Sequence, residues 1–239
     1  MKVELVGVSG SGKTTLAKCV EKRLQEQHGL VAESTTPAFR PSRSAWYKVC
    51  WLFYSCKYFR LDTWRLYYRH TNIAYWYKRR GLSHKMWLAW QPVFVSYYLQ
   101  QIEKNKIDVV VDDGSPFHRY VPHENEDSTY INEDFVGLYE RSTLNMCNQV
   151  LVVEIDTPSE VAAGRRMARD KIAGSQKESL KKQIVAQRQK HKATLNKVDA
   201  SFSDETVTVM TVDGTKTPEV LAREVAKKVM EVGEFGGKG

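Results

Sequence analysis

The chain has 239 residues and a formal net charge of +8 at pH 7. This length allows one α/β domain with an elaboration or two small domains, and it can bury a core that needs no disulfide or metal. The four cysteines contain no C-x-x-C pair, which argues against a zinc site or a secreted disulfide scaffold and favours a reduced, cytoplasmic protein. No stretch is uniformly apolar over the length of a membrane span.

The first expected elements are a short strand over residues 3–6 and a helix that begins near Lys13. Between them, residues 7–14 fit the Walker A pattern G-x-x-x-x-G-K-[ST] completely. Glycines let backbone N–H groups approach a polyphosphate, Lys13 supplies a positive charge, and the Thr14 hydroxyl can bind Mg²⁺. A glycine turn without a ligand would not explain the Lys-Thr pair. The predicted nucleotide-binding residues of this loop are Gly7, Ser9, Gly10, Ser11, Gly12, Lys13, Thr14 and Thr15.

A second strand is predicted at Leu30–Ala32, and it ends in Glu33. Ligands of open α/β sheets bind beyond the carboxyl ends of the strands. Glu33 is therefore a candidate general base or substrate ligand, and a solvated turn acid is the alternative.

Residues 40–98 carry the excess positive charge, with eleven Lys or Arg against the single acid Asp62, and they hold all six tryptophans. The helical spacing of the aromatic residues predicts two or three helices. We expect a helical insertion at about 40–90. It can be a helical cap that packs on the core, or a substrate cap that closes on an anionic ligand. It can also be a surface for acidic membranes. Nucleic-acid binding is disfavoured because no accompanying motif is present.

The apolar run 109–111 predicts a buried parallel strand that ends in Asp112 and Asp113, as in a Walker B site. Asp112 is the expected Mg²⁺ ligand, and Asp113 is expected to face the substrate or the attacking group. Either acid could instead cap the turn that follows. Arg119, further along the same loop, is a candidate substrate contact.

A fourth strand is predicted at 150–155, and Thr157-Pro158-Ser159-Glu160 reads as a capping box at the start of the next helix. That helix carries a basic cluster that could clamp a phosphoryl group or simply face solvent. A polar helix at about 178–197, a strand at 207–214 and a last helix from Thr217-Pro218 follow. Residues 233–239 are expected to form a flexible tail. The members of the basic cluster that we assign to the site are Arg165, Arg166 and Arg169.

Strands that alternate with helices predict a five-stranded parallel sheet. With its phosphate loop first, acids after the third strand and arginines after the fourth, the chain resembles the nucleoside and nucleotide kinase group of P-loop proteins, which includes thymidylate kinase. The resemblance implies a single three-layer P-loop domain over 1–239 with strand order 2-3-1-4-5. It also implies MgATP as donor and an arginine-bearing lid at about 160–197. Glu33 matches the base of the deoxynucleoside kinase branch, whereas Asp112-Asp113 departs from the family's Asp-Arg or Glu-Arg pair.

We therefore expect an ATP- and Mg²⁺-dependent kinase that transfers the γ-phosphoryl group to a nucleoside, nucleotide or related small acceptor. The expected catalytic residues are Lys13, Glu33, Asp113, Arg165 and Arg169, with Arg166 on the nucleotide, and the base is either Glu33 or Asp113. One alternative is a kinase of a sugar or lipid-linked metabolite that meets a membrane through 40–98. Another is an NTP-dependent switch that uses the same segment to bind a partner. A homodimer is left open.

Overall fold

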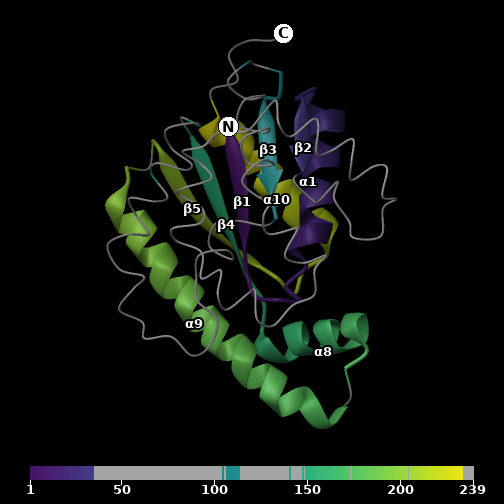
Figure 1. The fold of residues 1–239 in the computed structure, drawn as a ribbon. Helices are drawn as coiled ribbons and strands as arrows, with labels where there is room; N and C mark the ends of the chain where they lie inside the picture. The colour runs from purple at the N-terminus through teal and green to yellow at the C-terminus, as the bar shows by residue number, and fades with distance from the viewer. Residues whose placement is uncertain are drawn as a thin grey trace, which may run out of the picture.

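The computed structural model describes residues 1–34, 104, 106–113, 140, 147, 149–172, 174–203 and 205–233 (Figure 1). The aromatic segment 40–98, Arg119 and the tail beyond residue 233 lie outside the described residues. The predictions made for them therefore stay predictions.

The described residues form an α/β structure around a five-stranded sheet in which every pairing is parallel. This confirms the predicted α/β class and the predicted five-stranded parallel sheet. The observed order is β2-β3-β1-β4-β5, so the central strand β1 pairs with β3 and β4. The strands are β1 (Lys2–Val6), β2 (Ala32–Ser34), β3 (Val109–Asp112), β4 (Val150–Asp156) and β5 (Val207–Asp213).

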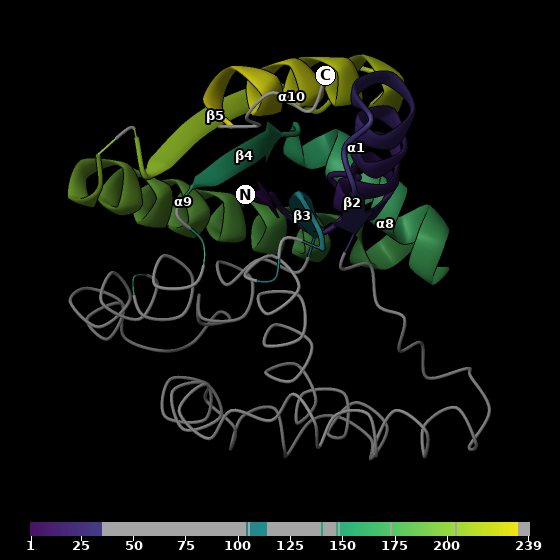
Figure 2. The same ribbon diagram turned by 90° about the horizontal axis from the view of Figure 1, so that it is seen from above.

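Helices cover both faces of this sheet. Figure 2 shows α1 (Lys13–His28) and α10 (Pro218–Val232) on one side and α9 (Lys177–Ser201) on the other. The main core lies under α1 and α10, where Leu5 packs with Leu16 and Val225. A smaller core joins Val6 to Leu195 of α9. The fourth described helix, α8 (Ser159–Asp170), lies beyond the end of β4 (Figure 1).

The helix ends follow local sequence signals in two cases. The helix α1 stops at Gly29, which adopts a left-handed φ of 64° and donates its N–H to Leu24 O. The helix α10 starts at Pro218 after Thr217, as predicted. Val220 of this helix is 39% exposed, whereas Leu221, Val225 and Val229 are buried.

The capping box predicted after β4 is wrong. The helix α8 begins at Ser159 without a side-chain cap, and Thr157 Oγ1 is buried without a hydrogen-bond partner. A Cβ atom added to Gly214 would lie 2.0 Å from Thr157 Oγ1, so Thr157 packs against the loop after β5 instead of turning toward the helix.

The second strand lies further along the chain than predicted, at Ala32–Ser34, and Val31 is half exposed. Asp108 pairs with Val31 just before the strand: Val31 N donates to Asp108 Oδ2 at 2.8 Å, and Asp108 N donates to Val31 O at 2.8 Å. Glu33 is the middle residue of β2.

Candidate functional site: the loop between β1 and α1

The loop of residues 7–12, the predicted phosphate loop, joins β1 to α1. Gly10 and Gly12 have φ values of 92° and 95°, which side chains rarely tolerate. A Cβ on Gly10 would lie 2.2 Å from Ala162 O of α8, whereas one on Gly12 would meet nothing within 4 Å. The loop is thus closed by α8 at Gly10 and open at Gly12. The helix α1 begins at Lys13 with no side-chain cap, and such a helix start attracts anions.

The side chain of Lys13 folds back onto the loop that precedes it. Its Nζ donates to Gly7 O at 2.7 Å and to Val8 O at 3.0 Å. Burial lowers the pKa of Lys13 to about 7; the charge of Asp113 opposes this shift, and that of Arg169 adds to it. The loop lysine therefore shares one electrostatic environment with an acid that follows β3 and an arginine of α8.

The second acid after β3, rather than the first, meets the loop. Thr14 Oγ1 donates to Asp113 Oδ2 at 2.7 Å. Asp112 is buried, and its Oδ2 lies 3.4 Å from Nζ of Lys2. Because side chains alternate along a strand, Asp112 shares a face with Glu4, its register partner in β1, while Asp113 reaches α1. Asp112, the expected Mg²⁺ ligand, thus lies beside Lys2, and Asp113 is the acid that contacts Thr14.

Lys2 and Glu4 are charged neighbours of Asp112 that the sequence analysis missed. Lys2 Nζ donates to Glu4 Oε1 at 2.5 Å, and Lys2, Glu4 and Asp112 are each at most 4% exposed. We call these three residues the buried ion network. The signal that could have revealed it is the polar residue at every second position of an otherwise apolar strand.

The three predicted arginines of α8 do not form one cluster. Arg165 Nη1 donates to Gly214 O at 3.1 Å, in the loop between β5 and α10. Arg169 binds Asp170 through Nε at 2.7 Å and Nη2 at 3.0 Å, and Arg166 Nε lies 3.5 Å from the same carboxylate. Arg166 and Arg169 are therefore both paired with Asp170, which lies within one helical turn of each.

Glu33 sits apart from the phosphate loop, because β3 lies between β2 and β1. Burial raises the pKa of the half-buried Glu33 carboxyl, and the charge of Glu21 adds to the shift. A raised pKa suits a group that accepts a proton in a reaction.

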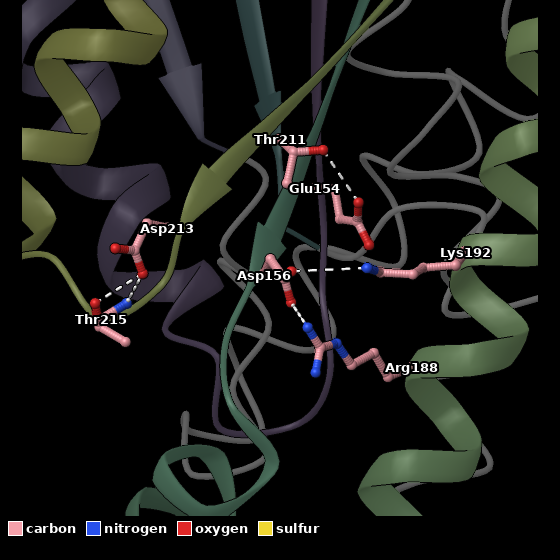
Figure 3. Close-up of polar contacts among 7 residues, drawn as sticks. All are labelled: Glu154, Asp156, Arg188, Lys192, Thr211, Asp213 and Thr215. Atoms are coloured by element: carbon pink, nitrogen blue, oxygen red, sulfur yellow. Dashed lines mark hydrogen bonds and ion pairs between the residues drawn. The ribbon is translucent and has the colours of Figure 1, made fainter.

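A further polar cluster joins the end of β4 to α9 (Figure 3). Asp156 forms an ion pair with Arg188 and lies 3.7 Å from Lys192 Nζ. Thr211 Oγ1 donates to Glu154 at 3.2 Å. Sequence analysis treated α9 as a polar helix and missed these contacts, because their partners lie far away in the chain.

The described residues contain no group of three or more His, Cys, Asp or Glu that could hold a metal alone. Mg²⁺ bound with a nucleotide needs only one or two protein oxygens, because phosphates and water supply the others. The Thr14–Asp113 pair fits that requirement. In the same described part of the chain, no helix is both long and apolar enough to cross a membrane.

Comparison with known proteins adds little. No protein-family model and no curated protein matches the chain. Among solved structures, it is similar to an uncharacterized protein from Eubacterium ventriosum with a TM-score of 0.44 and 10% sequence identity, over 97% of this chain and 98% of that chain. A similarity of this degree says nothing about activity, so function has to be argued from the site itself.

Proposed function

We propose that the protein is an ATP- and Mg²⁺-dependent phosphotransferase that acts on a small acceptor. The observation that carries this proposal is the 2.7 Å contact between Thr14 and Asp113 beside an uncapped helix start. A hydroxyl and a carboxylate are hard oxygen ligands suited to Mg²⁺, and the adjacent N–H groups suit phosphate. Both lie next to a lysine that can neutralise further phosphate charge.

In this proposal, different residues bind the phosphates and the Mg²⁺ ion. Lys13 and the loop N–H groups hold the phosphates, and Thr14 with Asp113 holds Mg²⁺. Arg169 lies close enough to affect the pKa of Lys13, so it can add positive charge to the same anion once it leaves Asp170. MgATP supplies the γ-phosphoryl group, and the chain contributes mainly orientation and charge.

Glu33 is the residue that we assign to the phosphoryl acceptor. Its raised pKa and its place in β2 support a role as the base that accepts the proton of an acceptor hydroxyl. Asp113 is the less suitable base, because Thr14 already donates to its carboxylate. The acceptor class remains the predicted one, a nucleoside, nucleotide or related small molecule.

The test is ADP release from MgATP with and without separate pools of nucleosides, nucleotides, sugars and sugar phosphates. We expect one pool to stimulate release strongly, and splitting that pool identifies the acceptor. If ATP binds but no pool and no liposome preparation stimulates release, the kinase proposal is wrong and a nucleotide-dependent switch is favoured.

The two acids are expected to respond differently to loss of charge. Asp113→Asn should raise the Mg²⁺ concentration needed for half-maximal activity about 10- to 100-fold, because it weakens an oxygen ligand. Asp112→Asn is the matched control: it should lower the unfolding temperature more and shift the Mg²⁺ requirement less, because Asp112 belongs to the buried ion network. Mg²⁺ titrations and thermal melts of both variants measure this. A Mg²⁺ shift confined to the Asp112 variant would contradict the assignment.

A further inference from the structure

Asp156 lies where three segments meet: the end of β4, the helix α9, and the loop between β5 and α10. It ends β4, the strand beside β1, and its side chain is 28% exposed. One carboxylate oxygen pairs with Arg188 and the other lies 3.7 Å from Lys192 Nζ, so Asp156 holds two side chains spaced one turn apart on α9 (Figure 3). Asp156 therefore links the end of β4 to one face of α9.

The backbone of Asp156 holds a different segment. Asp156 O accepts a hydrogen bond from Gly214 N at 2.9 Å, at the start of the loop between β5 and α10. The carbonyl of Gly214 in turn accepts from Arg165 of α8 at 3.1 Å, and Thr157 packs against the same glycine. Asp213 begins this loop and accepts from Thr215 N and Oγ1, which fixes the turn.

The helix α9 also contacts the phosphate loop directly. Gln187, the residue before Arg188, accepts a hydrogen bond from Ser9 N through its Oε1 at 3.4 Å. Val8 packs in a buried apolar cluster with Ala162 and Ala163 of α8 and with Leu180 and Ile184 of α9. The position of α9 therefore bears on the backbone of residues 8 and 9, which must receive a polyphosphate in the proposed function.

We propose that Asp156 is a positioning residue for the nucleotide. Its side chain sets α9 against the phosphate loop, and its carbonyl holds the loop between β5 and α10 in place. This inference rests on the proposed function, because it takes ATP as the ligand. Asp156 touches no phosphate in this scheme and acts through Arg188 and Gln187.

The experiment measures ATP affinity of the full chain by titration calorimetry, together with the unfolding temperature without nucleotide. Asp156→Asn should weaken ATP binding about fivefold, the upper effect of a partly exposed ion pair, and Asp156→Glu should restore part of the loss. Glu178→Gln, an exposed acid of the same helix, is the control and should leave affinity unchanged. Gln187→Ala tests the route, because its effect on ATP affinity should be less than additive with that of Asp156→Asn.

A purely structural role would lower the unfolding temperature of Asp156→Asn and leave ATP affinity as in the wild type, and this result would overturn the inference alone. Tighter ATP binding by Asp156→Asn would also overturn it, because the freed Arg188 and Lys192 would then be phosphate ligands. If the effects of Asp156→Asn and Gln187→Ala on ATP affinity add fully, Asp156 does not act on the phosphate loop through α9. Failure of the wild-type chain to bind ATP would overturn the proposed function and this inference together.

Discussion

Replacement of Lys13 by methionine is expected to lower ATP turnover at least about 100-fold, because it removes a preorganised positive charge from the site where phosphate charge develops. The variant should nevertheless fold. Lys13 Nζ is held by Gly7 O and Val8 O in a partly buried position, and burial lowers its pKa to about 7. A buried ammonium costs free energy in the nucleotide-free protein, so an apolar side chain of similar length is expected to be tolerated.

ADP release and thermal melts measure the two halves of this expectation. ATP should raise the unfolding temperature of the wild type and leave that of Lys13→Met unchanged, since only a ligand that binds the folded state stabilises it. Lys18→Met is the matched control, because Lys18 is an exposed lysine of the same helix, α1. Turnover in Lys13→Met equal to that of the control would remove the basis of the phosphate-loop assignment.

The pH dependence of ATP binding follows from the same lysine. The pKa of Lys13 is about 7 without nucleotide, and a bound triphosphate raises it because phosphate favours the charged ammonium. At about pH 8, ATP binding should therefore take up a proton at Lys13, and affinity should fall as pH rises above the lower pKa. Calorimetry in buffers of different ionisation enthalpy detects this uptake, and Lys13→Met should lose it.

Replacement of Lys2 by methionine is expected to reduce the free energy of unfolding by about 3–5 kcal/mol. The buried ion network places two carboxylates, Glu4 and Asp112, within 2.5 and 3.4 Å of Lys2 Nζ at the centre of the sheet. Removing the cation leaves both negative charges buried next to each other. Urea denaturation measures the loss, with the slope of the transition checked for two-state behaviour.

The control for this variant is Lys22→Met. The Lys22 side chain is 73% exposed, and its Nζ lies 3.8 Å from Glu26 Oε1 on α1. The substitution therefore removes the same charge from a solvated ion pair. Such a pair contributes about 0.5 kcal/mol or less. The double variant Lys2→Met, Glu4→Gln should recover part of the lost stability, because one buried negative charge is gone. Equal, small losses for Lys2→Met and Lys22→Met would show that the network does not support the sheet.

Features that depend on neighbours in the chain could be predicted from the sequence. Lys13 and Thr14 belong to a contiguous pattern, and Gly29 and Pro218 mark helix ends through their own backbone preferences. The α/β class and the parallel sheet followed from the alternation of apolar runs and helices, and the structure confirms both. These features can be predicted because the residues that determine them lie close together in the sequence.

Features that depend on tertiary contacts could not be predicted. The choice between Asp112 and Asp113 is set by which face of the sheet each side chain occupies, and that depends on the pairing of β3 with β1. The helical spacing of Arg165 and Arg169 correctly put both on α8, but their partners differ because Gly214 approaches only the first. The Asp156–Arg188 pair joins a strand to a helix 32 residues later, beyond the range of any local pattern.

The central position of β1 has a consequence for synthesis of the protein. Val3 is flanked in the finished sheet by Val111 and Leu151, which are made long after it. At about 5–20 residues per second, the apolar strand that carries the phosphate loop waits on the order of ten seconds with both edges unpaired. The strand that leads into the predicted phosphate loop is thus open to wrong association during synthesis, so the yield of folded protein depends on how well that strand is shielded until its partners emerge.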